Sequence, residues 1–355
     1  ENSNVNILNC QFEEIGALNA FTISGYGVWA NSFDGTHTLD FLGLGQTSSP
    51  TFNKVSCPIS SHTGSLKVSQ VNSTDSHVGI HYYNSDTPSS FPPGGIQIDH
   101  CNFEAYRSKT GAIFIGEGDK LLLSSLSISN CVIRDNFDFV FAPSNGGGFD
   151  ETEYRSGIRI MSSEQTSLGL FRIHNNEFYS DNKSTSATFN ITGIRIVNII
   201  GGTVQNNQCY DFNEASAPTS NKFKGIWLDN CRDIDIFDNK VHGNAGAYNV
   251  SSKRSDGISL YESGFCNLKC NDVDFVRNGI VFEGEGCDQS SLLQNKFNTH
   301  HNGLYLFSDA IIGQQGSTAP HENQWLSNSA ILDGNYDFVG FDPLDQFSLN
   351  RANMS

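Results

Sequence analysis

The segment Phe171–Phe178 reads FRIHNNEF, and the segment Gly193–Ile196 reads GIRI. In the first, apolar residues alternate with polar ones before an Asn and a final apolar residue. In the second, a Gly is followed by apolar residues at its first and third positions. A period of two is typical of β-strands that turn one face to a core. Both patterns recur along most of the 355 residues, so we expect a chain built from repeated pairs of short strands.

The first pattern ends each time with Cys or Asn two positions before the last apolar residue. Its segments are Val5–Phe12, Ile96–Phe103, Leu126–Ile133, Phe171–Phe178, Gly202–Cys209, Ile234–Val241, Cys266–Val273 and Ser290–Phe297. The recurring position is occupied by Cys10, Cys101, Cys131, Asn176, Asn207, Asn239, Asn271 and Asn295. A stacked Asn can hydrogen-bond to its neighbours and tolerates the left-handed conformation of a tight bend. Cys can fill the same inward site as a small apolar group. We interpret this column as a structural ladder.

The second pattern is aligned by its Gly, which we expect at a corner that has no room for a side chain. These glycines are Gly27, Gly79, Gly111, Gly157, Gly193, Gly225, Gly257, Gly279 and Gly303. Two short strands per repeat, punctuated by Gly and Asn, favour a β-solenoid over pairs of helices. The sequence therefore predicts an all-β parallel β-helix of about nine or more coils over residues 1–310. We expect residues 36–76 to hold one irregular coil with an insertion, and residues 311–355 to form a C-terminal cap of the same domain.

Between about Val5 and Leu306, these segments resemble the right-handed parallel β-helix of the pectin-lyase-like superfamily. The resemblance implies that fold, but it implies little about activity, because the fold hosts lyases, hydrolases, esterases, tailspikes and adhesins. The segment HENQW, His321–Trp325, is similar to an ending of large β-helix proteins that bacteria export by type IX secretion. The chain also opens inside a repeat. We therefore expect a piece of a larger precursor, secreted or displayed at the cell surface beside the other domains of that precursor.

The composition restricts the partners. A formal net charge of −17 disfavours nucleic acid and anionic membrane surfaces, because both require cationic patches. No apolar run is long enough for membrane insertion. The acidic balance also suits divalent cations such as Ca²⁺, although no cofactor and no metal ligands are identified. Nine Cys is an odd number, and several occupy inward positions, so we interpret them as small buried thiols.

Long connections follow four consecutive segments of the first pattern. They are Arg134–Ser156, Tyr179–Thr192, Tyr210–Lys224 and His242–Asp256. Because they leave the same corner, they must stack side by side, and loops on one face of a solenoid usually carry the binding site. Their aromatic residues include Tyr154, Phe189, Phe223 and Tyr248.

The outward residue of each Gly-containing strand lies next to these loops. The expected column is Trp29, His81, Ile113, Arg159, Arg195, Trp227, Ser259, Val281 and Tyr305. Two guanidinium groups about 5 Å apart repel each other unless an anion lies between them. That anion could be a loop carboxylate (Asp150, Glu151 or Glu153) or a uronate or sulfate of a bound ligand.

We therefore treat the Arg column as a hypothetical ligand site, in which Trp227 stacks on a sugar ring or covers apolar surface. The candidate residues are Arg159, Arg195, Trp227, Tyr154, Asp150, Glu151, Glu153, Phe189, Phe223 and Tyr248. The alternative is that folded loops satisfy the arginines and that the aromatic residues only pack the loops.

No catalytic residue is identified. A lyase of this fold would need a calcium-binding carboxylate cluster and a basic residue, and a hydrolase would need carboxylates on adjacent strands. Asp99, Asp229, Asp235 and Asp238 are expected on different faces. We favour a non-catalytic, adhesin-like module that binds a polysaccharide or surface glycan. A polysaccharide lyase or glycoside hydrolase acting in the long-loop cleft, and a structural spacer, are the alternatives.

Overall fold

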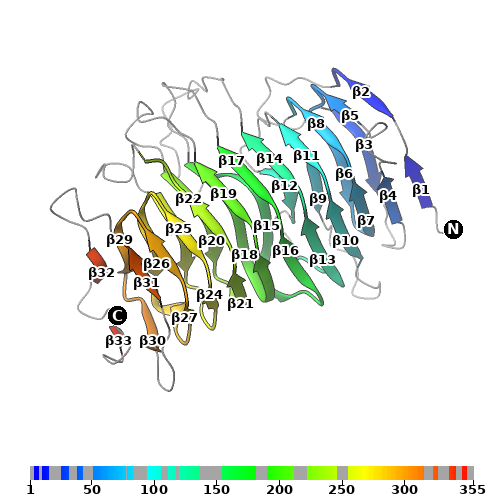
Figure 1. The fold of residues 1–355 in the computed structure, drawn as a ribbon. Helices are drawn as coiled ribbons and strands as arrows, with labels where there is room; N and C mark the ends of the chain where they lie inside the picture. The colour runs from blue at the N-terminus through cyan, green and yellow to red at the C-terminus, as the bar shows by residue number, and fades with distance from the viewer. Residues whose placement is uncertain are drawn as a thin grey trace, which may run out of the picture.

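The chain folds as a stack of parallel β-coils, shown in Figure 1 as a computed structural model with the N-terminal coils in blue and the C-terminal coils in orange and red. The structure describes residues 4–7, 10–15, 25–31, 38–42, 51–76, 78–83, 94–104, 111–116, 120–135, 154–180, 190–211, 222–245, 255–315, 323–326, 336–340 and 346–349. Each coil passes through three strands in turn, which we call the entry, middle and column strands. Every strand pairs in parallel with its counterparts in neighbouring coils. The predicted all-β parallel solenoid is confirmed.

The entry strands carry the alternating part of the first sequence pattern. They are β1 (Asn4–Ile7), β4 (Thr38–Leu42), β7 (Ser65–Ser69), β10 (Gly95–Asp99), β13 (Ser125–Ser129), β16 (Phe171–His174), β21 (Arg232–Phe237), β24 (Asn267–Lys269) and β27 (Ser291–Leu293). Where the structure describes the connection, from β7 onward, they end at a tight corner, beyond which the middle strand begins.

The middle strands form an 11-stranded sheet, which gives eleven described coils. They are β2 (Gln11–Glu13), β5 (Thr51–Asn53), β8 (Asn72–Thr74), β11 (Asn102–Glu104), β14 (Val132–Asp135), β17 (Glu177–Ser180), β19 (Gln208–Asp211), β22 (Lys240–His242), β25 (Asp272–Asp274), β28 (Lys296–Asn298) and β31 (Gln324–Leu326).

The column strands carry the Gly-containing pattern. They are β3 (Tyr26–Asn31), β6 (Cys57–His62), β9 (Ile80–Tyr83), β12 (Gly111–Ile115), β15 (Tyr154–Ser167), β18 (Asn190–Gln205), β20 (Lys222–Asp229), β23 (Ser255–Tyr261), β26 (Val276–Glu283), β29 (His300–Phe307) and β32 (Tyr336–Gly340). Strand β18 continues through the following entry position, where it pairs with β16 and β21, so entry and column strands join in one 20-stranded sheet. A short 3-10 helix, η1 (Glu285–Cys287), and a separate pair, β30 (Ile311–Gln315) with β33 (Gln346–Leu349), complete the described elements.

Inward apolar residues build the core by stacking like on like. Ile158, Ile194 and Ile226 are in register on successive coils, and each is at most 1 % exposed. Burying such a side chain contributes roughly 2 kcal/mol. The preceding Gly193 faces Cys209, and a Cβ added to it would lie 2.5 Å from the Cys209 Sγ. The expected corner without room for a side chain is therefore present.

The ladder runs along the tight corner between entry and middle strands. The Asn176 Nδ2 donates to the Asn207 Oδ1 at 3.0 Å and to the Ile128 carbonyl at 3.0 Å. The same bonds repeat through Asn207, Asn239, Asn271 and Asn295, and Asn323 adds a further rung. All nine cysteines are free thiols, and seven of them are buried. The structural interpretation of the ladder and the interpretation of most cysteines as small buried groups are confirmed.

The left-handed bend at this corner belongs to the residue before the ladder rather than to the ladder Asn itself. Residues with positive φ at this position are His100, Asn130, Asn175, Asn206, Asp238, Cys270 and Gln294. The ladder residue keeps an ordinary backbone conformation and uses its side chain to bind neighbouring coils. The bend and the hydrogen bonding are thus divided between two adjacent residues.

Two regions differ from the sequence expectation. Residues 38–42 and 51–76 contain regular strands in register with their neighbours, so the expected irregular coil is not present there. The insertion that we also expected stays a prediction, because residues 43–50 lie outside the described ranges. Val71 occupies the ladder position there, because Asn72 pairs with Asn102, so the Cys or Asn signal is missing. In the segment 311–355, β31 pairs with β28 and Asn323 joins the ladder, so its described residues extend the stack. That the segment also closes the stack stays a prediction.

Candidate functional site

The outward column runs along the column strands, with one residue from each coil. Its members in register are Trp29, Ser60, His81, Phe114, Arg159, Arg195, Trp227, Ser259, Val281 and Tyr305. The predicted sequence of Arg159, Arg195 and Trp227 on successive coils is present.

The predicted column contained Ile113, and this residue is wrong. Ile113 pairs with Ile80 and Ile158 and lies in the core, whereas Phe114 pairs with His81 and Arg159 and faces outward. Ala112, not Gly111, takes the corner position in this coil, and its carbonyl lies against Gly79. Aligning the coil by its Gly therefore shifted every residue by one.

Arg195 is held by protein groups. The residue is only 5 % exposed, and its Nη2 donates to the Asp229 Oδ2 at 3.2 Å. Asp229 ends the same strand that carries Trp227, so the expectation that this carboxylate faces elsewhere is wrong. Among the described residues, Asp229 of the next coil neutralises Arg195. This pairing favours a structural role for the arginine.

Trp227 lies beside two cations. The guanidinium carbon of Arg195 is 4.0 Å from the ring centroid, and the Lys224 Nζ is also 4.0 Å from it. Arg195 comes from the coil before, and the Lys224 Nζ lies 3.2 Å from the Ser259 Oγ on the coil after. The residue is 8 % exposed. Cation–π attraction to these two groups accounts for the position of the ring.

Arg159 has a different environment from Arg195, although the two occupy equivalent positions in identical GIRI segments. It is half-buried, its guanidinium carbon lies 5.5 Å from the Phe114 ring centroid, and its Nε donates to the Met161 Sδ. Arg159 is therefore the more accessible of the two arginines.

The remaining candidate residues divide into two groups. Phe223 is 4 % exposed and belongs to the hydrophobic core, so it is removed from the ligand site. The others lie outside what the structure describes, either as whole residues or, for Tyr154 at the start of β15, as a side chain: Asp150, Glu151, Glu153, Phe189, Tyr248 and Tyr154. The prediction that the four long loops stack side by side next to the column stays a prediction, as does the alternative that they fold over the arginines.

The N-terminal half of the column carries an aromatic series that the sequence patterns did not reveal. The ring centroids of His62 and Tyr83 are 4.2 Å apart, those of Tyr83 and His81 are 5.1 Å apart, and those of His81 and Phe114 are 5.2 Å apart. His81 and Phe114 are buried, at 5 % and 6 % exposed. Trp29 and Tyr26 form a separate pair nearer the N-terminus, with ring centroids 6.3 Å apart, and they are 54 % and 40 % exposed. The signal in the sequence was the pair His81 and Tyr83, which flanks the inward Tyr82. It becomes visible once Phe114 and residues 57–62 are aligned with this strand.

A second, buried polar row lies one residue before each corner. In successive coils it consists of Ser156, Thr192, Lys224, Asp256, Asn278 and Asn302. The Asn278 Nδ2 donates to the Asp256 Oδ1 at 2.7 Å, and the Asn302 Nδ2 donates to the Asn278 Oδ1 at 2.7 Å. The Lys224 Nζ of this row reaches the Trp227 ring, whereas Asp256, its register partner on the next coil, is fully buried. The sequence patterns alone did not indicate this row.

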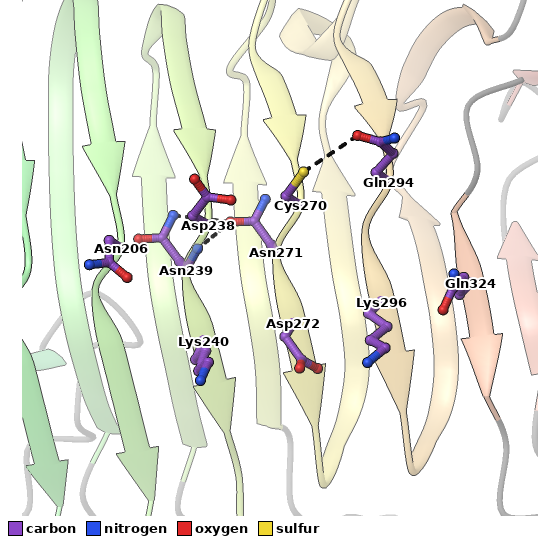
Figure 2. A pocket seen from close by; sticks show the side chains of 10 residues that line it. All are labelled: Asn206, Asp238, Asn239, Lys240, Cys270, Asn271, Asp272, Gln294, Lys296 and Gln324. Carbon is purple, nitrogen blue, oxygen red and sulfur yellow. Dashed lines mark hydrogen bonds between the residues drawn. The ribbon is translucent and has the colours of Figure 1, made fainter. Parts of the chain in front are cut away.

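A separate groove of about 490 Å³ lies on the outside of the tight corner. Figure 2 shows two rows of side chains on either side of the ladder residues Asn239 and Asn271. One row consists of the left-handed residues Asn206, Asp238, Cys270 and Gln294, and the other of Lys240, Asp272, Lys296 and Gln324. The second row belongs to middle strands on successive coils.

Two further observations concern metal ions and membranes. Within the described ranges, no three His, Cys, Asp or Glu side chains gather in a way that could bind a metal ion, so a Ca²⁺ site stays a prediction. In the same part of the chain, no helix is long and apolar enough to cross a membrane.

The chain was compared with protein-family models, with curated proteins and with solved structures. No family model matches it, no curated protein matches it, and no solved structure matches it.

Proposed function

We propose that the protein binds an extended, acidic polysaccharide along the outward column, with sugar rings stacked at its N-terminal end and an acidic group held by Arg159. The observation that carries the proposal is the exposed aromatic pair Trp29 and Tyr26, which lies at the N-terminal end of the column strands that carry half-buried Arg159 farther along. Exposed aromatic faces are costly in water and are the usual partners of the apolar faces of sugars.

The polarity of the column supports an anionic ligand. The protein carries a net charge of −17, yet Arg159, Arg195 and Lys224 gather on neighbouring coils of one face. Asp229 is an anionic partner of Arg195, whereas Arg159 lies nearer to solvent. A uronate or sulfate that reaches Arg159 would form a charge-assisted hydrogen bond, the strong kind for an exposed site.

The test is binding of acidic and neutral polysaccharides on an array, followed by titration of the best ligand. Trp29→Ala is expected to lower affinity by about fivefold to tenfold, and Arg159→Ala by about tenfold or more, because one removes a stacking face and the other a charge-assisted bond. Leu170→Ala is the matched control, since Leu170 is 44 % exposed but lies off the column. Full binding by both column variants would remove the column as the ligand site.

A lyase acting at the same face is the second candidate, and one observation favours it. Lys224 and Asp229 of β20 lie close to Arg195, one beside the Trp227 ring and the other as its ion-pair partner. A base and a carboxylate, which a lyase would need, are therefore near each other. Release of unsaturated sugars from acidic polysaccharides in the presence of Ca²⁺, and its loss in Lys224→Ala, would support this candidate. No product from any polysaccharide of the array would oppose it.

The wider setting belongs to the same proposal. The resemblance to the pectin-lyase-like superfamily and to type IX cargo supports a secreted or surface-displayed, adhesin-like protein. A purely structural spacer is the remaining alternative, and it predicts no glycan binding at all.

A further inference from the structure

The groove at the tight corner has a distinctive alternation of charge. Lys240, Asp272 and Lys296 are in register on three successive coils, and their side chains project side by side (Figure 2). Successive coils are about 4.8 Å apart, which places the two lysines roughly 10 Å from each other, with a carboxylate between them.

The two ammonium groups are available to a ligand. Lys240 and Lys296 are exposed, and neither side chain has a hydrogen-bond or ion-pair partner among the residues that the structure describes. Asp272 is half-buried, and its Oδ1 accepts a hydrogen bond from the Asn298 Nδ2 at 2.7 Å. Its position between the lysines is therefore fixed, while the lysines are free to reach an anion.

The other lining groups favour hydroxyl-rich ligands. Asn206, Gln294 and Gln324 offer both amide donors and amide acceptors, and Asp238 adds an acceptor on the opposite row. A flexible polyanion with charge at every position would bring one anion against Asp272, where like charges repel. A neutral chain would leave both ammonium groups without a counter-charge.

We propose that this groove binds an acidic glycan in which charged sugars alternate with neutral ones. Lys240 and Lys296 each hold one acidic group, and the Asp272 carboxylate accepts hydrogen bonds from the hydroxyl groups of the neutral sugar between them. The proposal goes beyond binding at the outward column and does not require it, because the groove lies on the opposite side of the middle strands from the loop corner and shares no residue with the column.

The experiment uses three oligosaccharides of matched length, titrated against the full chain by calorimetry at low salt. Unsulfated chondroitin carries a uronate on alternate sugars, chondroitin sulfated on its amino sugars carries charge on every sugar, and a malto-oligosaccharide is neutral. We expect the unsulfated chondroitin to bind most tightly, and added salt to weaken it. Lys240→Gln and Lys296→Gln should each reduce its affinity by about fivefold to tenfold.

Asp272→Asn provides the sharpest variant, because it should reverse the preference. With the central carboxylate removed, the sulfated oligosaccharide should gain affinity by several-fold and overtake the unsulfated one. Lys67→Gln, an exposed lysine on β7 far from the groove, is the control and should bind as the parent does. Trp29→Ala should also leave this binding intact, which separates the groove from the column.

The proposal is overturned if no oligosaccharide binds at millimolar concentration, or if the two groove lysine variants bind as tightly as Lys67→Gln. Tightest binding by the fully charged oligosaccharide to the unaltered chain would also overturn it. The lysines and Trp29 are exposed, and in Asp272→Asn the amide oxygen can still accept from the Asn298 Nδ2, so an unchanged thermal unfolding profile is expected to accompany each result.

Discussion

The ladder and the outward column both run along the stack with one residue per coil, but they differ in how their residues change. At the ladder, one residue type repeats from Asn176 to Asn323, and each amide uses the same bonds to the coil before and the coil after. In the column, the residue changes from coil to coil, from Trp29 through Arg159 to Val281. Repetition of one polar residue indicates a role that every coil needs. Variation at a fixed position indicates a role that belongs to particular coils.

The two arginines of the column sharpen this difference. Arg195 donates to Asp229 and lies over Trp227, whereas Arg159 is half-buried beside Phe114 and Met161. Identical GIRI segments therefore place one arginine in a buried ion pair and the other near solvent. The neighbouring coil, rather than the local sequence, decides which role each arginine has.

Among the tests, raising the pH should have the largest effect, because it acts on the buried thiols of the interior. Burial raises the pKa of Cys209 and of Cys231 to about 12 and that of Cys287 to about 11, and it raises the pKa of Cys57, Cys131 and Cys266 as well. Unfolded thiols ionise near pH 8.5. The folded state keeps its protons above that pH, so the unfolded state is favoured as the pH rises toward the folded pKa values. Each such thiol should cost about 1.4 kcal/mol of stability per pH unit in that window.

The measurement is urea unfolding from pH 7 to pH 11. Stability should be level below about pH 8 and fall steeply above about pH 9, by on the order of 10 kcal/mol or more by pH 11, because the six thiols act together. Alkylation of the folded protein at pH 8 should modify only the half-buried Cys10 and Cys270. Rapid labelling of Cys209 under these conditions would contradict the burial on which the prediction rests.

Removing one rung of the ladder should have the next largest effect. Asn239→Ala removes the acceptor of the Asn207 N–H and the donors to the Val204 carbonyl and to Asn271. Several buried polar groups then lose their partners at once, and we expect a loss of roughly 3–5 kcal/mol in the free energy of unfolding. Asn267→Ala removes exposed bonds to Asp235 and Ser291 and should cost less than about 1 kcal/mol. Equal losses in the two variants would mean that the ladder is not a special structural element.

The two arginines of the column separate a structural role from the proposed binding role. Arg195→Ala leaves Asp229 without its partner on a mostly buried face and should lower the free energy of unfolding by about 2–3 kcal/mol. Arg159→Ala should lower it by less than about 1 kcal/mol, because its environment is more solvated. Thermal unfolding of both variants checks this. If Arg159→Ala is the more destabilised, the assignment of the two roles must be exchanged.

The solenoid could be predicted because its sequence signals are local and repeated. Alternating Ile and Val define the strands, and the Cys or Asn at the tight corner defines the register. The prediction failed where a coil places a different residue at the same position. Because Val71 occupies the ladder position of one coil, the sequence pattern missed that coil. Because Ala112 rather than Gly111 occupies a corner, the alignment left Phe114 out of the predicted column. Of the site, the order Arg159, Arg195, Trp227 could be predicted from the register. The partnership of Arg195 with Asp229 could not, because it depends on which side chain the next coil presents.

The exchange of Cys for Asn along the ladder leads to the smallest expected effect. The Cys131 N–H already donates to the Asn176 Oδ1 at 3.0 Å. In Cys131→Asn, the new amide can donate to that same oxygen and accept from the Cys101 N–H, as the rungs below it do. We expect stability to change by no more than about 1 kcal/mol, with a gain if the larger side chain fits without strain. Cys209→Asn is the matched control, because Cys209 faces Gly193 within the core, away from any ladder amide. Burying an amide there should cost about 2 kcal/mol or more. If urea unfolding shows the same loss for both variants, the thiol and the amide are not interchangeable rungs, and the N-terminal coils must keep their register through core packing alone.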